Sequence, residues 1–136
     1  WVESVCKAYK PDIVILDMGD KFARTAGFAR ADEALKANAI HARMIAKEHQ
    51  CAMFYMSQLS ADAEGKVLLN QSMMEGSRTG KAAEADLMIL IAKNPPRQDE
   101  TEEDLQRHLN VVKNKLTGWH GVVHCNLNYQ IGRYEV

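Results

Sequence analysis

An aspartate follows a short apolar segment near the start of the chain. Residues 13–16 read IVIL, and Asp17 comes directly after them. A run of this kind is typical of a core strand, and an aspartate at the carboxyl end of such a strand commonly holds Mg²⁺ beside the phosphates of a nucleotide. A strand-terminal or cap-forming aspartate is the other interpretation of so short a pattern. Asp17 is therefore a candidate magnesium ligand.

A second apolar segment also ends in polar residues. Residues 51–56 read CAMFYM, and Ser57 and Gln58 follow them. If both segments are neighbouring parallel strands, their polar ends lie at the same edge of the sheet. A glutamine at that edge can contact a γ-phosphate and transmit its loss to the following loop. The alternative is a simple loop amide.

Residues 76–81, GSRTGK, come close to a phosphate-binding loop. The motif GxxxxGK[ST] needs four residues between its glycines and a hydroxyl residue after the lysine. Here three residues separate the glycines, and Ala82 follows Lys81. No clear strand leads into the segment, so we treat it as a near miss. Lys81 is its candidate for phosphate contact.

Lys113 and Lys115 precede a Thr-Gly turn near the carboxyl end. Two lysines at positions i and i+2 of a strand end point the same way and could reach a phosphate, although a solvated hairpin tip explains them equally well. His120, His124 and Cys125 lie nearby but lack a second ligand pair of defined spacing. A metal site there is not indicated.

The elements that must position these residues follow from the apolar pattern. Residues 13–16, 51–56 and 87–92 predict strands, which we expect to be buried on both faces as in a parallel sheet. Residues 28–49 contain no Gly or Pro and predict a long helix, so the order strand, helix, strand favours a right-handed βαβ unit. The apolar residues that predict the buried face of this helix are Ala34, Ala37, Ile40 and Met44.

The remaining segments predict the ends and the loops. Residues 1–9 predict a helix that Pro11 ends. Residues 60–81 mix Gly, Ser, Asn and charges, as long functional loops do, and residues 94–104 are acidic and solvated. Residues 108–127 predict a hairpin around Thr117–Gly121, followed by a reversal at Gly132.

Composition excludes several classes of protein. The 136 residues are 46% hydrophobic and 26% charged with a net charge of −1, which indicates one globular domain without a basic whole surface. The longest apolar runs fall far below the roughly 18 residues of a membrane span. The three cysteines are widely separated, so we expect a reducing compartment and no disulfide framework.

Four segments, in this order, resemble the RecA-like motor domain of hexameric replicative DNA helicases, the DnaB-like family in its phage form. They read PDIVILDMGDKF, HARMIAKEHQCAMFYMSQLS, EGSRTGKAAEADLMILI and VVKNKLTGWHGVVHCNLNYQIGRYEV. The resemblance covers nearly the whole chain. It implies an α/β, RecA-like P-loop NTPase core, with a mainly parallel sheet flanked by helices and a C-terminal β-hairpin.

The resemblance also implies roles for the candidate residues. Asp17 matches the Walker B aspartate that holds Mg²⁺, and Gln58 matches the glutamine that senses the γ-phosphate of ATP. Lys113 and Lys115 match a basic pair that reaches into the ATP site of a neighbouring subunit. The family usually has an arginine finger where this chain has Lys115, and lysine offers only a point charge in place of a planar fork.

Three further residues complete the implied nucleotide site. Residues 75–86 match the segment that closes the third motif, which brings Arg78 and Lys81 toward the nucleotide, and Arg78 is a candidate substitute for the arginine finger. Tyr129 is a candidate nucleotide-binding aromatic residue, and the alternative for an aromatic residue near the end of the chain is packing. The Walker A loop and the catalytic glutamate of the family precede the Walker B strand and are not in these 136 residues. We therefore expect a single partial ATPase domain over residues 1–136 that does not turn over ATP alone.

The family's pore loops follow the Walker B strand and the sensor strand. By position they are residues 19–30 and 60–74. The DNA-binding candidates in them are Lys21, Arg24, Arg30, Lys66 and Asn70. Phosphate contacts of this kind fix register without reading sequence, as a translocating motor requires.

The resemblance implies a parent enzyme that couples ATP hydrolysis to 5′ to 3′ unwinding of DNA. Its partners would be single-stranded DNA, identical subunits in a homo-hexamer, and a primase, with a cytoplasmic location and an origin in a phage. One alternative is a recombinase or recombination mediator of the same superfamily. Another is a non-catalytic nucleic-acid-binding module.

Overall fold

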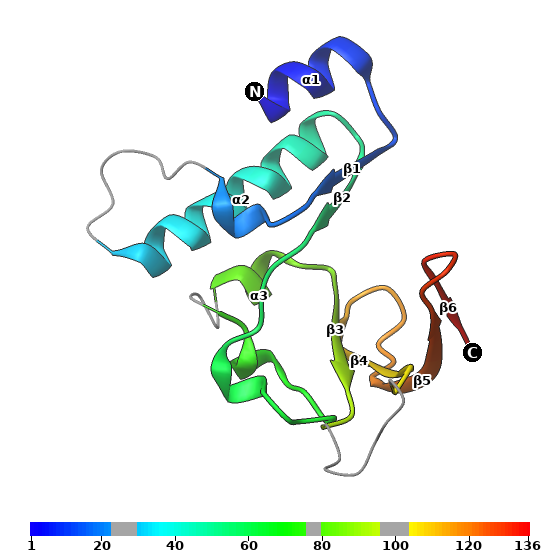
Figure 1. The fold of residues 1–136 in the computed structure, drawn as a ribbon. Helices are drawn as coiled ribbons and strands as arrows, with labels where there is room; N and C mark the ends of the chain where they lie inside the picture. The colour runs from blue at the N-terminus through cyan, green and yellow to red at the C-terminus, as the bar shows by residue number, and fades with distance from the viewer. Residues whose placement is uncertain (23–29, 76–79, 96–103) are drawn as a thin grey trace. The chain divides into compact units, whose positions relative to one another are not determined.

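A computed structural model describes residues 1–22, 30–75, 80–95 and 104–136 of the chain (Figure 1). These residues form two compact units, described in turn below. The first comprises Trp1–Leu59 and Met74–Glu84, and the second comprises Ser60–Met73 and Ala85–Val136. No helix within the described ranges combines the length and the apolar character that crossing a membrane requires.

The first unit contains the predicted βαβ arrangement. Strand β1 (Ile13–Leu16) pairs in parallel with β2 (Ala52–Tyr55), and the helix α2 (Ala31–Glu48) connects them. Figure 1 shows α2 running beside the two strands. The register pairs Ile13 with Ala52 and Leu16 with Tyr55, so both strands end at the same level.

Two shorter helices flank this arrangement. Helix α1 (Val2–Tyr9) ends at Lys10, which adopts a left-handed conformation with φ of 46° just before Pro11. The predicted end of this helix is therefore confirmed, because proline cannot continue it. Helix α3 (Gly80–Glu84) lies against α2, where the Arg43 guanidinium donates a hydrogen bond to the Glu84 carbonyl.

The long helix is confirmed, but its buried face is rotated from the predicted one. Of the predicted stripe, Ala34 is buried, whereas Met44 is 61% exposed. The inward face consists of small and aliphatic side chains at spacings of three and four: Leu35, Ala39, Ala42 and Ile45. Alanine occurs around the whole helix, so the apolar spacing alone did not distinguish the two faces.

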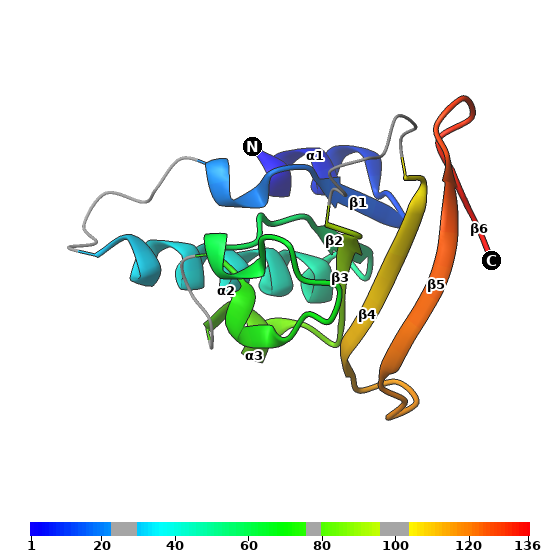
Figure 2. The ribbon, with the colours of Figure 1, turned by 60° about the horizontal axis from the view of Figure 1, so that its bottom comes forward.

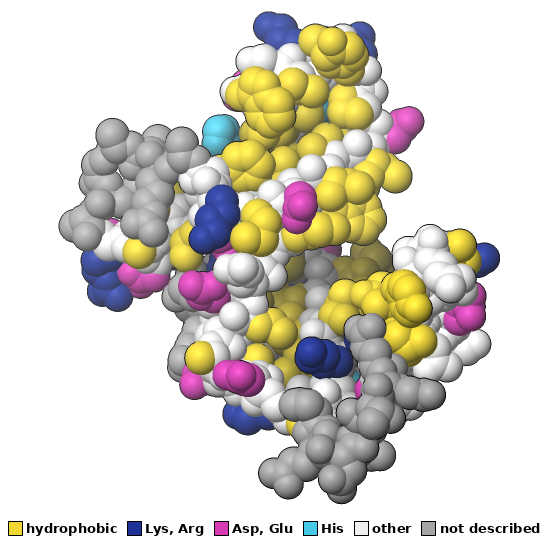
Figure 3. Space-filling model, viewed as in Figure 1, with side chains coloured by type: hydrophobic (Ala, Val, Ile, Leu, Met, Phe, Trp, Pro, Cys, Tyr) yellow, Lys and Arg dark blue, Asp and Glu magenta, His cyan; other side chains and the backbone are white. Residues whose placement is uncertain are grey.

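The prediction that β1 is buried on both faces is wrong for the described residues. Ile13 and Ile15 are 59% and 61% exposed, while Leu16 is buried. Phe54 of β2 is also exposed, at 54%. Figure 3 shows hydrophobic side chains at the surface over this part of the unit. The apolar run of β1 therefore places isoleucines on an exposed face and Leu16 on the buried one, and α2 packs against the neighbouring strand β2.

The second unit is an antiparallel sheet of four described strands. They are β3 (Leu87–Lys93), β4 (Gln106–Asn114), β5 (Gly121–Asn128) and β6 (Arg133–Glu135), in that spatial order. The predicted hairpin is confirmed as β4 and β5, which lie side by side in Figure 2, and the predicted reversal joins β5 to β6. Only β1 and β2 are parallel among the described strands, so the expected mainly parallel sheet is wrong for them.

Strand β3 also differs from its prediction. Met88, Leu90 and Ala92 are buried, whereas Leu87, Ile89 and Ile91 are 44–47% exposed. This alternation is typical of an antiparallel sheet with one covered face. The loop Ser60–Met73 covers part of the buried face, since the buried Asn110 of β4 forms hydrogen bonds with the backbone of that loop. The loop contains two short helices, η2 (Ala61–Ala63) and η3 (Gln71–Met73).

Candidate functional site

Asp17 and Gln58 follow the two parallel strands at one edge of the sheet, as the sequence predicts. The peptide N–H of Met56 donates to the Leu16 carbonyl over 3.1 Å, and the N–H of Gly19 donates to the Met56 carbonyl over 2.9 Å. These bonds hold the segment after β1 against the segment after β2. The carboxyl ends of parallel strands are where α/β sheets bind ligands.

The Asp17 carboxylate is exposed at this edge. No group within the described ranges donates a hydrogen bond to it or forms an ion pair with it. An exposed carboxylate without a partner keeps all its lone pairs for a hydrated cation, and oxygen ligands of this kind are what Mg²⁺ takes in nucleotide sites. The geometry is compatible with magnesium binding at Asp17, which stays a prediction.

The Gln58 side chain is also exposed, while its backbone is held. The Gln58 carbonyl accepts the N–H of Glu75 over 3.2 Å, and Leu59 and Met74 form an antiparallel bridge. The backbone at Gln58 is therefore fixed, and its amide side chain remains available. That combination suits a residue that contacts a ligand from a rigid position.

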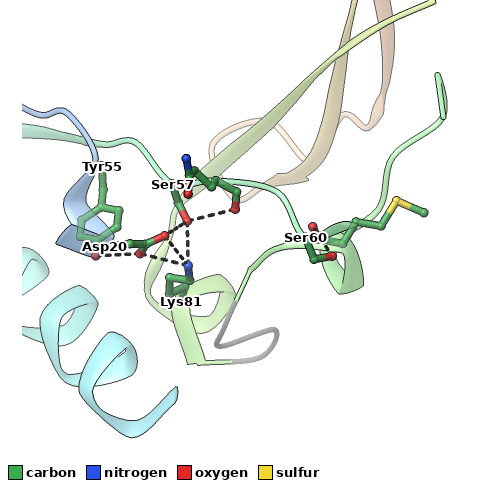
Figure 4. A network of polar contacts seen from close by, with 7 residues as sticks. Asp20, Tyr55, Ser57, Ser60 and Lys81 are labelled. Atoms are coloured by element: carbon green, nitrogen blue, oxygen red, sulfur yellow. Dashed lines mark hydrogen bonds and ion pairs between the residues drawn. The ribbon is translucent and has the colours of Figure 1, made fainter. Parts of the chain in front are cut away.

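A buried network lies beside this edge and connects three segments (Figure 4). The Lys81 ammonium lies 2.9 and 3.1 Å from the two carboxylate oxygens of Asp20 and 2.7 Å from the Ser57 hydroxyl oxygen. Ser57 in turn donates its hydroxyl hydrogen to Asp20. Asp20 lies in the short helix η1 (Gly19–Lys21), Ser57 directly precedes Gln58, and Lys81 lies in α3.

The network is a matched pair of charges with little contact with water. The side chains of Lys81 and Asp20 are 3% and 14% exposed. Burying either charge alone is costly, whereas a paired and hydrogen-bonded pair is tolerated. The oxygens of Asp20 are thus occupied by Lys81, Ser57 and Tyr55, whereas no described group bonds the Asp17 carboxylate.

Tyr55 closes the network from the end of β2. Its hydroxyl donates to Asp20 over 3.2 Å, and burial together with the negative charge of Asp20 raises the pKa of the Tyr55 phenol. The ring lies so close to Gly19 that a Cβ atom there would approach it to 2.5 Å. Glycine at position 19 therefore allows the ring to reach its place.

The phosphate-loop candidate Lys81 has its ammonium committed to this network. It is 4% exposed, and α3 is a single short turn of helix beginning at Gly80. Lys81 therefore links Asp20 to Ser57 in this structure, and its predicted contact with a nucleotide stays a prediction. Arg78, the candidate substitute for the arginine finger, lies outside the described residues, as does Arg24.

The basic pair belongs to the second unit. Lys113 is half-buried near the end of β4, opposite Met88 of β3. Lys115 lies beyond the strand in the turn, and its ammonium forms an exposed ion pair with Asp86 over 3.1 Å. A register shift lies between Met88 and Ile89, where Val112 is the extra residue of β4. Because β4 ends at Asn114, strand alternation does not extend across both lysines.

The remaining candidates are exposed. Lys21 ends η1, and Arg30 forms a surface ion pair with Asp32 at the start of α2, with 2.9 Å between charged atoms. Lys66 is exposed in the loop Ser60–Met73, and the Asn70 side chain accepts hydrogen bonds from Ser72. Their role in DNA binding stays a prediction.

Tyr129 and the metal-ligating residue types complete the survey. Tyr129 is 65% exposed just after β5. No group of three or more His, Cys, Asp or Glu side chains that could hold a metal ion occurs within residues 1–22, 30–75, 80–95 and 104–136. A magnesium ion at Asp17 would therefore need other oxygens, such as phosphate and water, to complete its coordination.

Sequence reasoning missed the network of Asp20, Tyr55 and Lys81. Asp20 and Lys81 are 61 residues apart, so no local spacing connects them. The only available signal was that Asp20 and Ser57 follow two strands that were expected to be neighbours. That signal predicts proximity at the sheet edge but does not identify Lys81 as the cation between them.

Comparisons with known proteins found similar solved structures but no match by sequence. No protein-family model matches the chain, and no curated protein matches it by sequence. A solved structure described as a DnaB-like replicative helicase and its interactions with primase matches 98% of this chain with a TM-score of 0.80 and 17% identity. A second solved structure, described as an ATPase domain, matches 98% of it with a TM-score of 0.83 and 17% identity.

The chain spans about a third of the first of these structures and about half of the second, at 33% and 49%. The resemblance inferred from the four segments is thus confirmed as a similarity of structure. At 17% identity, the likeness extends to the fold alone. The chain has the fold of part of the RecA-like ATPase domain of DnaB-like replicative helicases.

Proposed function

We propose that the chain is the carboxyl-terminal part of an ATP-dependent replicative DNA helicase motor. The observation that carries the proposal is the exposed Asp17 carboxylate, which no described group bonds, at the ligand-binding edge of a parallel strand pair. The fold of the chain matches helicase ATPase domains over 98% of its length. In the proposed motor both units belong to one domain. A phosphate-binding loop elsewhere in the polypeptide holds ATP.

The chemistry assigned to the first unit concerns the subunit's own nucleotide. Asp17 would hold Mg²⁺ directly or through water, and the ion would supply positive charge beside the phosphates of ATP. Gln58 contacts the γ-phosphate from a backbone fixed by Glu75, and the loss of that phosphate is transmitted to the loop that follows Gln58. Arg78 is proposed to contribute to the same site, and Tyr129, which belongs to the second unit, is proposed separately as a nucleotide contact.

The second unit supplies cations to a neighbouring subunit. Lys115 leaves its exposed ion pair with Asp86 and approaches the neighbour's γ-phosphate together with Lys113. An exposed ion pair contributes about 0–1 kcal/mol, so the exchange of Asp86 for phosphate has a low cost. This arrangement requires a neighbouring subunit, and we propose that the subunits form a homo-hexameric ring. A primase is the proposed protein partner.

Single-stranded DNA is the proposed substrate of two loops. The exposed cations Lys21 and Arg30 and the loop residues Lys66 and Asn70 contact its phosphates, together with Arg24. Because the chain carries a net charge of −1, these local groups rather than a general basic surface must attract DNA. Binding should therefore weaken as the salt concentration rises.

The main alternative is a recombinase, which shares the RecA-like fold and forms filaments. An unwinding assay distinguishes the two, using the complete polypeptide that contains this chain with a duplex carrying a 5′ single-stranded tail, and with a matched duplex carrying a 3′ tail. ATP-dependent strand separation of the 5′-tailed duplex alone supports the helicase. Strand exchange with no unwinding would contradict it.

A further inference from the structure

The second unit contains a buried asparagine that binds loop backbone. Asn110 lies in the middle of β4 and is 2% exposed. Its side-chain oxygen accepts the N–H of Leu69 over 3.0 Å, and its side-chain nitrogen lies 3.0 Å from the Val67 carbonyl oxygen. One side chain thus bonds the backbone of the loop on both sides of Leu68.

A buried amide at this place needs a reason. Its paired neighbour Leu90 and the adjacent Met88 are apolar and buried, so an apolar residue would fill the position without polar atoms to satisfy. Burying an amide is costly unless its hydrogen bonds are made. The bonds to Leu69 and Val67 meet this need and attach the loop to β4.

A second hydrogen bond runs from a loop side chain to the backbone of β4. The Gln71 amide nitrogen donates to the Val112 carbonyl over 2.8 Å, and Val112 is the extra residue of β4 at the register shift. The loop is also closed at its base, where the Ser60 N–H and hydroxyl both donate to the Met73 carbonyl, over 2.8 and 3.1 Å. The loop is therefore a closed segment attached to β4 at two points.

The candidate DNA-binding and nucleotide-binding residues are sequence neighbours of the residues that form these hydrogen bonds. Lys66 directly precedes Val67, and Asn70 directly precedes Gln71. On the strand, Lys113 directly follows Val112, three residues beyond Asn110. A shift of the end of β4 thus acts on the loop through two hydrogen-bonded links rather than through a flexible chain.

We propose that Asn110 and Gln71 are positioning residues that attach the DNA-contacting loop Ser60–Met73 to the strand that carries Lys113. The inference rests on the proposed function and deepens it. When Lys113 and Lys115 engage or release the neighbour's nucleotide, β4 moves the loop with it. Neither Asn110 nor Gln71 contacts a reacting atom.

The test uses Gln71→Met in the complete polypeptide, because Gln71 is half-buried and its replacement keeps the length of the side chain while removing the donor. The matched control is Gln130→Met, the same change at an exposed turn position after β5. Hydrolysis of ATP is measured with and without single-stranded DNA, together with base pairs unwound per ATP consumed. Asn110→Leu provides the second variant.

Gln71→Met is expected to keep DNA-independent hydrolysis at the control level and to reduce DNA stimulation and unwinding per ATP by on the order of 10-fold to 10²-fold, as misplaced positioning groups do. Folded Asn110→Leu should likewise keep DNA-independent hydrolysis and lose DNA stimulation and unwinding per ATP. Equal DNA stimulation and equal unwinding per ATP in Gln71→Met and Gln130→Met would overturn this inference but not the proposed function. A wild-type polypeptide without DNA-stimulated hydrolysis would instead overturn the proposed function, and the inference with it.

Discussion

Lys81 and Asp20 form an ion pair across 61 residues of sequence, with 2.9 Å between the ammonium nitrogen and a carboxylate oxygen. Their side chains are 3% and 14% exposed. The pair joins α3 to the segment after β1, next to the exposed Asp17. We infer that it holds the sheet edge in the shape that presents Asp17 and Gln58.

The first prediction concerns the stability that this pair provides. Lys81→Met should lower the free energy of unfolding by about 3 kcal/mol, because the partly buried Asp20 carboxylate loses its cation. Lys36→Met, at an exposed position of α2, is the control and should change stability by no more than about 0.5 kcal/mol. Urea unfolding measures both free energies. Equal midpoints for the two variants would show that the pair of Lys81 and Asp20 does not stabilise the fold.

The second prediction concerns pH dependence at Tyr55. Burial and the Asp20 carboxylate raise the pKa of Tyr55 above its ordinary value of 10.0. Its contribution to stability is therefore fully present below pH 10.0 and is lost as the pH rises through the folded-state pKa, because the unfolded phenol releases its proton first. Thermal unfolding of wild type and Tyr55→Phe at increasing pH checks this.

In Tyr55→Phe the alkaline loss of stability should be smaller than in wild type. The matched control is Tyr9→Phe, which removes a phenol that is 80% exposed. If Tyr55→Phe and Tyr9→Phe follow the same curve as wild type, the Tyr55 phenol does not ionise with a raised pKa.

The third prediction separates stability from activity at Lys115. Removing its exposed partner with Asp86→Asn should change the free energy of unfolding by less than about 1 kcal/mol. In the complete polypeptide, Lys115→Ala should reduce ATP hydrolysis by about 10³ to 10⁵-fold, the range for cations supplied in trans, and Lys115→Arg should retain or raise it. Mixing Lys115→Ala subunits with wild type should inactivate interfaces in proportion to their number. Near-normal hydrolysis by Lys115→Ala would contradict its trans role, which would then belong to Lys113 or Arg78, or leave this segment a solvated hairpin tip.

The sequence predicted local structure well where periodicity and chain breakers agree. Pro11 and the apolar segment after it predicted the end of α1 and the start of β1, and both are confirmed. The hairpin of β4 and β5 is confirmed as well, since alternation and the Thr-Gly turn indicate the same structure. These features depend on residues close together in the chain.

Features that depend on distant residues were predicted less well. Leu87–Lys93 is apolar on both faces, so its composition did not show that β4 pairs with it antiparallel or that one face is exposed. The bonds of Asn110 to the loop and of Lys81 to Asp20 join residues more than forty positions apart. Spacing within one segment contains no information about such contacts.

If Asp17 supports magnesium-dependent ATP hydrolysis, one pair of matched variants should separate its role from that of any other surface carboxylate. Asp17 and Asp12 are exposed carboxylates at opposite ends of β1, so Asp17→Asn and Asp12→Asn make the same change at the two edges of one sheet. The measurement is DNA-stimulated ATP hydrolysis by the complete polypeptide as Mg²⁺ is varied. We predict that Asp12→Asn retains wild-type rates and that Asp17→Asn loses hydrolysis at every Mg²⁺ concentration. Equal rates in the two variants would contradict the account.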